Sequence, residues 1–329
     1  MAVYTIIKLK NLSPLHIGTG KENYDFSATE LQSDTLSAAL AAIRVQRGKR
    51  DKLKDFLESF RLSSAFPFVA NHYFLPKPQG KLDIDLLDCD EYISRKKVKK
   101  IKFLEFALWQ SIIKGKSLSV KEKQLQGEFL TTIPDGEFDK PYKSLVNQRV
   151  TIPREEGKEA DPFFFDWTYF NANAGLYCLI ETSKPYLNEI LDLFRELGEW
   201  GIGTDKNIGG GKFEIETDSL SIEEISNPNA TLLLSLYIPS ENEFPELNLT
   251  RSRYELLQRG GFIAGSEETD FRHLRKKSVY MFNVGSVFNT TQKLSGKIVD
   301  LKPDWNDERM HSIYRSGIPF TIPIKTTIL

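Results

Sequence analysis

A glycine-rich segment near the middle of the chain carries the residues best suited to chemistry. Residues 201–212 read GIGTDKNIGGGK, with five glycines and two lysines. Glycine permits a positive φ and a close approach of backbone, so N–H groups can turn toward an anion. A helix precedes the segment and Phe213 follows Lys212, which excludes both a nucleotide P-loop and a dinucleotide fingerprint. The segment therefore favours the phosphates of a polymer, with RNA as the leading candidate.

Each residue type in this segment predicts a different contact. The glycines allow backbone approach, the lysines supply charge, and Thr204 and Asn207 can hydrogen-bond phosphate, 2′-hydroxyl or base edges. The residues are Gly201, Gly203, Thr204, Lys206, Asn207, Gly209, Gly210, Gly211 and Lys212. The competing interpretation is a tight connection from helix to strand that needs small residues.

A histidine stands in an early loop, Ser13 to Gly20, at position 16. A ribonuclease that attacks through the 2′-hydroxyl needs one group as base and another as acid. No second histidine lies near His16 in the sequence. We therefore expect a packing or RNA-contact role for His16, and we assign no catalytic residue.

Composition limits the classes of function. The 329 residues are 40% hydrophobic and 12% aromatic, enough for a sizeable core, and the net charge is −1. Nucleic-acid binding must then rest on local basic patches, of which residues 44–54, 95–102 and 272–277 are the clearest. Cys89 and Cys178 lie far apart, so we expect no metal, disulfide framework or cofactor. No membrane segment is expected, and the cytoplasm is the simplest setting.

The periodicity of apolar residues predicts an α+β fold. A first strand spans 3–10, and Ser33 and Asp34 are expected to cap a helix that buries Leu36, Leu40 and Ile43. Residues 48–145 lack a clean period apart from a helix near 101–114, and are interpreted as an insertion. The expected elements that follow are a hairpin at 149–170 beginning with a strand at 149–152, a strand at 175–182, a helix at 186–200 and a strand from 213.

The order strand, helix, strand, strand, helix, strand is that of a ferredoxin-like unit, which is also the fold of the RRM. This first domain is expected to span 1–221. A linker at 222–229 opens a second domain, 222–329, interpreted as a degenerate unit of the same type.

Several segments, in this order, resemble RAMP proteins, the repeat-associated subunits of CRISPR effector complexes. They are residues 12–18 (LSPLHIG), 33–40 (SDTLSAAL), the hairpin start 149–154 (RVTIPR), the glycine-rich segment, Gly260-Gly261 and 279–286 (VYMFNVGS). Together they are most similar to the type III-A (Csm) subunit that caps the complex at the 5′ end of the guide RNA. The resemblance covers nearly the whole chain except the irregular insertion.

The resemblance implies tandem ferredoxin-like domains, a thumb-like hairpin and a non-catalytic subunit that binds the repeat-derived 5′ tag of the crRNA. It also implies contact with the large palm-domain subunit and with the backbone RAMP subunit. Beyond the glycine-rich segment, the candidate RNA-binding residues are His16, Gly18, Ser33, Ser37, Arg44, Arg149, Arg154, Arg251, Arg253, Gly260, Gly261, Lys276 and Lys277.

Alternatives stay open at this point. The chain could be a crRNA-processing endoribonuclease of the same fold, a phosphate-ligand enzyme that uses the glycine-rich segment, or the equivalent subunit of a type III-B complex. The hairpin also has two interpretations. The aromatic run at 163–167 is either core, or a thumb that wedges beside a base, since stacking contributes roughly 1–3 kcal/mol per base.

Overall fold

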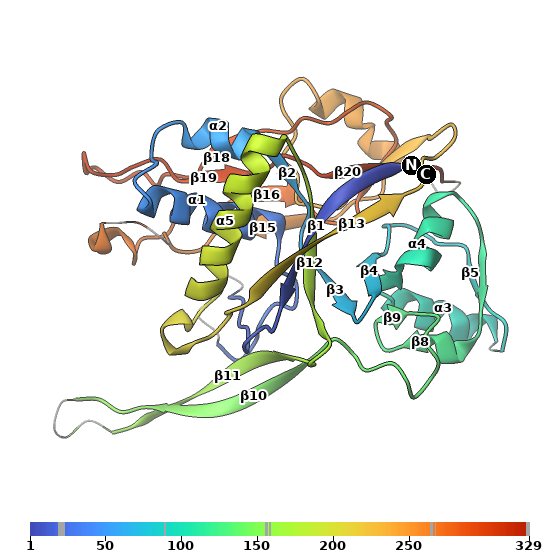
Figure 1. Cartoon of the computed structure of the whole chain (residues 1–329), viewed down its shortest axis with the longest axis horizontal. Helices are drawn as coiled ribbons and strands as arrows, with labels where there is room; N and C mark the ends of the chain where they lie inside the picture. Colours follow the sequence, from blue (N-terminus) through green and yellow to red (C-terminus); the bar gives the residue numbers. More distant parts are fainter. Residues whose placement is uncertain are drawn as a thin grey trace.

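The structure, a computed structural model, describes residues 1–18, 24–88, 90–154, 157, 159–263, 266 and 268–326. It consists of a body from which one long hairpin projects (Figure 1). No helix in these ranges is long and apolar enough to cross a membrane. Thr19 and Gly20 of the early loop, the tip of the hairpin at Glu155, Glu156 and Lys158, and Cys89 lie outside the described residues.

A nine-stranded sheet runs through the body in the order β13-β1-β12-β3-β4-β6-β9-β8, with β2 also paired to β12. Its strands are β1 (Ala2–Lys10), β2 (Phe60–Leu62), β3 (Phe66–Val69), β4 (His72–Pro76), β6 (Phe103–Glu105), β8 (Leu125–Gln126), β9 (Phe129–Leu130), β12 (Ala174–Thr182) and β13 (Glu214–Ile222). The pairing is antiparallel except between β6 and β9.

Helices cover one face of this sheet. They are α1 (Ser33–Gln46), α2 (Leu53–Glu58) and α5 (Lys184–Trp200). Leu36 and Leu40 of α1 pack with Phe194 of α5 in one buried cluster. Pro185 in its first turn favours the start of α5, and the positive φ of +80° at Gly201 ends it. The helix therefore delivers the glycine-rich segment to the end of the sheet.

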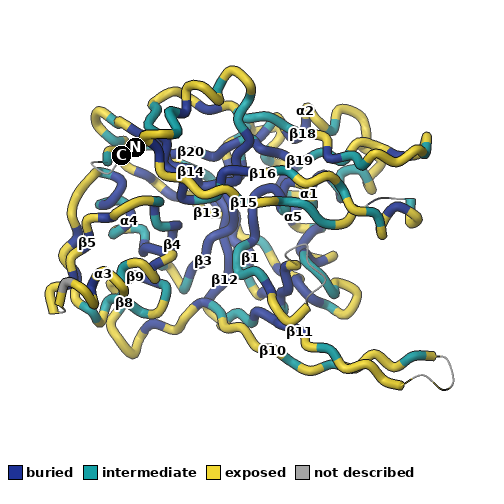
Figure 2. The backbone as a smooth tube through the Cα atoms, turned by 180° about the vertical axis from the view of Figure 1, so that it is seen from behind, coloured by how far each residue is buried: buried dark blue, intermediate teal, exposed yellow. Residues whose placement is uncertain are grey.

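The other face is covered by the C-terminal part of the chain and by segments from the interval 48–145. A three-stranded sheet contributes, built from β14 (Ala230–Leu233), β17 (Val287–Phe288) and β20 (Thr321–Ile324). Strand β12 is buried almost throughout, because both faces of the sheet are covered (Figure 2). Its continuous apolar sequence, Ala174 to Ile180, reflects that position.

Smaller elements complete the body. Between β4 and the hairpin lie β5 (Ile84–Leu86), α3 (Glu91–Lys100), α4 (Phe106–Ile113), β7 (Leu118–Val120) and the 3-10 turn η1 (Glu122–Gln124). The C-terminal part adds η3 (Phe244–Leu247), η4 (Leu249–Arg251), β15 (Leu256–Arg259), η5 (Thr269–Phe271), β16 (Val279–Phe282), β18 (Ile298–Asp300) and β19 (Tyr314–Ser316). The described residues after Ile222 form no α-helix.

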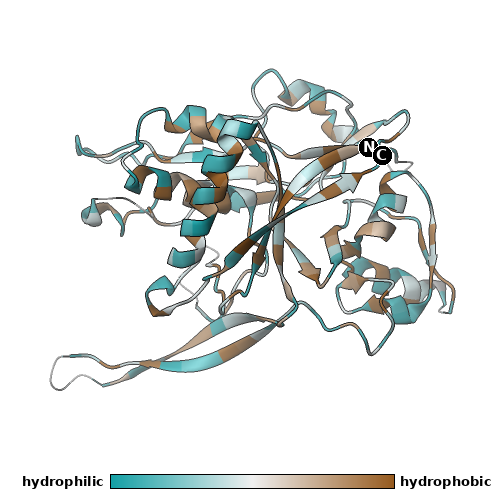
Figure 3. Cartoon of the chain, in the orientation of Figure 1, coloured by the Kyte–Doolittle hydropathy of each residue, from teal (hydrophilic) through white to brown (hydrophobic). Residues whose placement is uncertain are grey.

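The projecting hairpin consists of β10 (Tyr142–Thr151) and β11 (Asp161–Phe170). Its outer half is exposed, and it carries both apolar and polar residues (Figures 2 and 3). The base of the hairpin returns to the body, where Phe165 and Trp167 are buried. The hairpin is therefore anchored at one end only.

The structure corrects four expectations. Residues 149–152 belong to the hairpin and not to the main sheet, whose second strand is β2 and β3, inside the interval interpreted as an insertion. The helix expected at 101–114 is shorter, because β6 occupies its first turn. The hairpin begins at Tyr142, earlier than expected.

The fourth correction concerns the start of α1. Its N-cap is Gln32, so Ser33 and Asp34 lie inside the helix and are buried. Arginines from the C-terminal part contact the Asp34 carboxylate, which explains why an acidic side chain is buried there.

Candidate nucleic-acid interface

Three segments that are far apart in sequence meet at the base of the hairpin. Leu15 and Thr168 exchange backbone hydrogen bonds of 2.9 Å, which join the early loop to β11. The N–H of Thr204, in the glycine-rich loop (residues 201–212), donates to the carbonyl of His16 at 3.0 Å. The early loop is thus held between the hairpin and the glycine-rich loop, and the three form one hydrogen-bonded unit.

Four of the five glycines in the loop are packed against protein atoms. A Cβ at these positions would lie 1.8 to 2.7 Å from a neighbouring atom, at Gly201, Gly203, Gly210 and Gly211. By contrast, Gly209 and, in the early loop, Gly18 have open space where a Cβ would stand. Tight packing therefore accounts for four of these glycines, and only Gly209 among the five has open space where a Cβ would stand.

The outer rim of the glycine-rich loop is polar and exposed. Lys206 and Asn207 lie in a 3-10 turn, η2 (Lys206–Ile208), and both are exposed, as is Lys212. The hydroxyl of Thr204 faces inward and donates to the carbonyl of His16 at 3.3 Å. The rim presents two cations and one amide to solvent, and the rest of the loop fixes their position.

Arg149 connects the hairpin to the glycine-rich loop. Its Nη1 lies 2.5 Å from Oδ2 of Asp205. The guanidinium also stands over the ring of Phe165, 4.1 Å from the centroid, and 5.2 Å from that of Trp167. An arginine stacked on aromatic rings and paired with a carboxylate is pre-organised. The sequence singled out Arg149 as a basic residue, but not its partner Asp205.

His16 is a core residue. Its side chain is 1% exposed, and Nδ1 lies 2.8 Å from the carbonyl oxygen of Asp166. The imidazole packs 4.5 Å from the ring of Phe165. The Asp166 carboxylate, which the sequence did not single out, accepts hydrogen bonds from the N–H of Ser27, at 3.0 Å, and the hydroxyl of Ser144. This geometry stabilises the base of the hairpin and does not present the imidazole to a substrate.

An exposed aromatic ring stands beside this unit. Tyr24 is 49% exposed and stacks on Phe165 with ring centroids 5.8 Å apart and an angle of 14°. Phe163 contacts it edge-on at 6.1 Å. A ring that is supported in this way and half exposed can stack with a nucleic-acid base. The sequence analysis did not identify Tyr24, although it lies only eight residues after His16.

One face of the hairpin carries exposed apolar side chains. Val150, Ile152 and Phe164 are 52%, 78% and 56% exposed. The register pairs Val150 with Pro162 and Gln148 with Phe164, which places these side chains on the face opposite Phe165. Arg154 follows, exposed, near the tip of the hairpin.

A second group of predicted residues gathers where α1 meets the C-terminal part. Ser33 and Ser37 are each 4% exposed, and Ser33 Oγ accepts a hydrogen bond from the N–H of Leu236 at 3.0 Å. The adjacent Asp34 pairs with Arg259, which leads into Gly260, Gly261 and, across the paired strands, Lys276.

The remaining predicted residues are dispersed. Arg44 pairs with Glu189 at 3.3 Å and ties α1 to α5. Lys277 pairs with Asp304 at 2.7 Å. Arg251 and Arg253 are exposed on the C-terminal part. We find no arrangement that joins these four to the base of the hairpin.

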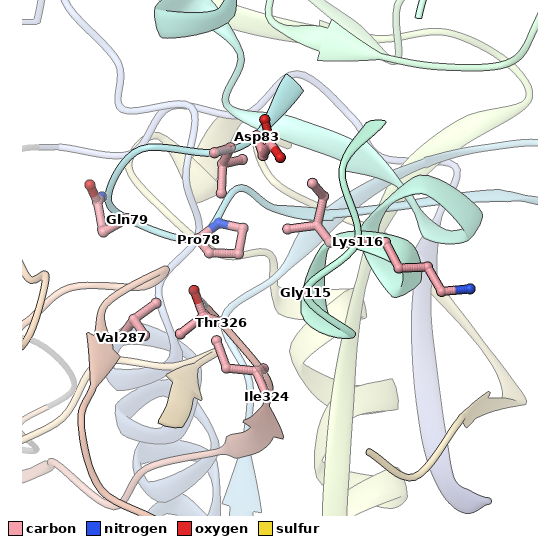
Figure 4. Close-up of a pocket in the computed structure, with 10 residues that line it drawn as sticks. Pro78, Gln79, Asp83, Gly115, Lys116, Val287, Ile324 and Thr326 are labelled. Carbon is pink, nitrogen blue, oxygen red and sulfur yellow. The ribbon is translucent and has the colours of Figure 1, made fainter. Parts of the chain in front are cut away.

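No group of histidine, cysteine, aspartate or glutamate side chains in the described ranges could hold a metal ion. A small cavity of about 20 Å³ lies between Gly115 and Lys116 on one side and Val287 and Ile324 on the other (Figure 4). It has room for little more than one water molecule, so it does not suit an organic ligand.

Comparison with known proteins shows that the chain is similar to CRISPR proteins named Csm4. Residues 226–324 match the model described as the CRISPR Csm4 C-terminal domain. A Mycobacterium tuberculosis protein named Csm4 is 25% identical over 313 residues, covering 93% of each chain. A Streptococcus thermophilus protein of that name is 26% identical over 297 residues, 88% of this chain and 89% of the relative. The chain is thus similar to proteins named Csm4 over most of its length, and its C-terminal part matches the Csm4 C-terminal domain.

Solved structures share the fold over nearly the whole length of this chain. A chain from a Csm1–Csm4 cassette in complex with cA4 matches with a TM-score of 0.63 and 17% identity, covering 99% of both chains. A chain from the Csm3–Csm4 subcomplex of the type III-A interference complex matches with a TM-score of 0.61 and 17% identity, covering 98% of this chain and 99% of that one. The expected α+β fold and the resemblance to a RAMP-type Csm subunit are confirmed.

Proposed function

We propose that this chain is a non-catalytic RNA-binding subunit of a type III-A CRISPR interference complex, working in the cytoplasm, that anchors the repeat-derived 5′ tag of the crRNA. The observation that carries the proposal is the convergence at the base of the hairpin. There the half-exposed ring of Tyr24 stacks on Phe165, and the same Phe165 ring lies under Arg149, which pairs with Asp205 of the glycine-rich loop. The exposed Lys206 and Asn207 follow Asp205 directly.

In this proposal, each residue at the rim makes a different kind of contact with the RNA. Lys206 and Lys212 contact phosphates, and the open position of Gly209 lets the RNA backbone come close. Asn207 hydrogen-bonds base edges or a 2′-hydroxyl, and Tyr24 stacks with a base. Arg149 positions the hairpin, whose outer, partly apolar face acts as a thumb that wedges beside a base.

The strand order supports a ferredoxin-like first unit. β13, β1, β12 and β3 are neighbours, with α1 and α5 on one face, as expected for a strand-helix-strand-strand-helix-strand unit. We place this unit within residues 1–221 and a degenerate second unit in 222–329. In an RRM the open sheet face binds RNA. Here that face is covered, which favours binding at the rim and the hairpin instead.

We also propose that the subunit bridges the large palm-domain subunit and the backbone RAMP subunit. The support comes from relatives with the same fold, which occur in a Csm1–Csm4 cassette and in a Csm3–Csm4 subcomplex. A protein that holds the 5′ end of the guide between two such neighbours would set where the guide begins in the complex.

The two enzymatic alternatives have less support. An endoribonuclease would need a histidine or another base that reaches the RNA, and the His16 imidazole is buried against Asp166 and Phe165. An enzyme acting on a small phosphate ligand would need a pocket at the glycine-rich loop, where four glycines pack against protein.

The test compares tagged and untagged crRNA across a salt series. If about four phosphates are contacted, log K falls against log salt with a slope near −3, since single strands give roughly −0.7 per phosphate. Lys206→Ala should weaken both RNAs equally and reduce the slope by about 0.7. Asn207→Ala should weaken the tagged RNA more, because base edges carry the sequence.

The matched control is Lys184→Ala, an exposed lysine at the opposite end of α5 from the glycine-rich loop, which should behave like wild type. Equal wild-type affinity for the two RNAs, with a slope near zero, would refute tag anchoring by this subunit.

A further inference from the structure

Two arginines contact one carboxylate where α1 packs against the C-terminal part, and a lysine lies on the neighbouring segment. The Asp34 carboxylate is fully buried and accepts from Nε and Nη2 of Arg259 at 2.9 and 3.0 Å. Arg315, on β19, contacts the same carboxylate and is 7% exposed. Lys276 lies on the neighbouring segment, where its N–H donates to the carbonyl of Gly261 at 3.1 Å, two residues after Arg259. One carboxylate therefore pairs with two arginines, and a third cation lies on the adjacent segment.

Burial makes this imbalance costly. It lowers the pKa of Arg315 to about 10 and also lowers that of Arg259. The pKa of Lys276 is lowered first by burial and then by repulsion from Arg259. A buried charge without a partner is unfavourable by several kcal/mol in general. The ion pairs with Asp34 explain why the two arginines are buried, but they do not explain the burial of Lys276.

Two donors at this place make no hydrogen bond with the described residues. The hydrogen bonds of Arg259 engage Nε and Nη2, and Nη2 also donates to Thr35 at 2.8 Å, while Nη1 has no partner among the residues that the structure describes. Nζ of Lys276 likewise pairs with no described residue. Arg259 is 19% exposed, so the cluster reaches the surface. Gly261, beside it, has open space at its Cβ position and a φ of +102°.

We propose that Arg259 and Lys276, backed by Arg315, form a binding pocket for one phosphate group. A guanidinium edge and an ammonium group are the donors that commonly hold phosphate, and the bound anion would neutralise the excess charge. The source we favour is a backbone phosphate of the RNA, which rests on the proposed function. The pocket would then add a contact from the C-terminal part to those made at the base of the hairpin.

The test uses Lys276→Met, which keeps the apolar stem and removes the charge. Thermal unfolding is measured in potassium phosphate and in potassium chloride at equal ionic strength. Since phosphate stabilises proteins generally through exclusion from their surface, the readout is the difference between variants. Wild type and Lys184→Ala should show the same extra stabilisation by phosphate, and Lys276→Met should lose it. Without phosphate, the variant should be at least as stable as wild type.

The second arm measures RNA affinity. Lys276→Met should bind RNA about tenfold more weakly, as expected for one lost charge-assisted contact, and Lys276→Arg should restore binding. If phosphate stabilises Lys276→Met as much as wild type, and RNA affinity is unchanged, the pocket is refuted while the proposed function stands. If wild type fails to bind RNA but shows stabilisation by phosphate that depends on Lys276, the pocket stands with free phosphate as its source, and the proposed function fails.

Discussion

The individual glycines of residues 201–212 have different roles, although the sequence presents them as one run. Gly211 has a φ of +66°, and its Cβ would lie 1.8 Å from the carbonyl oxygen of Ile202. Gly209 also has a positive φ, of +90°, but no atom within 4 Å of the Cβ position. The first is required by packing and conformation, and the second by conformation alone.

This contrast yields a stability prediction. Gly209→Ala should cost about 1 kcal/mol, the penalty of a side chain in left-handed backbone. Gly211→Ala should cost roughly 3 kcal/mol or more, because a steric clash with backbone is added. Urea unfolding of both variants measures the difference. Equal losses would mean that the loop is not packed as described. In properly folded Gly209→Ala, weaker RNA binding would place this glycine at the interface.

At the scale of elements, long periodic segments could be predicted from the sequence. The core stripe of α5, from Leu187 to Leu197, and the strand β1 are as expected, because each pattern reflects burial against its own neighbours. The failures are in short elements. β2 and β3 contain only three and four residues, too few to show a period, and β3 includes Pro67.

Likewise, only some residues of the candidate site could be predicted from the sequence. The glycine-rich loop and Arg149 are conspicuous in sequence because of their composition. Tyr24 and Asp205 are not, since their roles depend on contacts with β10 and β11, which begin more than a hundred residues from Tyr24 and more than thirty from Asp205. The burial of Asp34 could not be foreseen either, because a serine and an aspartate at a helix start normally act as caps.

A loop in the C-terminal part gives a prediction about pH. The Glu243 carboxylate accepts from the N–H groups of Ser240 at 2.9 Å and of Gly296 at 3.0 Å, and from that of Ser295. Burial by itself raises the pKa of Glu243, but hydrogen bonds, first from Ser295 and then from Ser240, outweigh it and lower the pKa to about 2. The carboxylate therefore links the segment at Ser240 to the segment at Ser295 and Gly296.

A carboxyl group whose pKa is depressed on folding adds stability above its unfolded-state pKa, about 4.3, and loses it as the pH falls through the folded value. Glu243→Gln should therefore be less stable than wild type at pH 7 by roughly 1 kcal/mol, because solvent partly screens the group. The difference should shrink between about pH 4.3 and 2. Denaturant unfolding at several pH values measures it, and a constant difference would contradict the assignment.

At the scale of the whole molecule, the near-neutral charge and the doubly covered sheet act together. With a net charge of −1, the molecule has little long-range attraction for RNA, so the proposed binding would depend on a few aligned groups. Because the sheet is covered on both faces, we propose that those groups lie on loops and on the hairpin. The early loop, the hairpin and the glycine-rich loop share hydrogen bonds, which would let them hold a single strand in a defined place.

Photo-crosslinking in the assembled complex tests tag anchoring most directly. A crRNA with photoreactive nucleotides in the 5′ tag is bound, irradiated and digested, and the crosslinked peptides are identified by mass spectrometry. We predict crosslinks within residues 204–212, at Tyr24, and along β10 and β11, with none in the exposed first turn of α5 near Lys184. Crosslinks confined to other subunits, or to the far side of this chain, would contradict the claim that it anchors the tag.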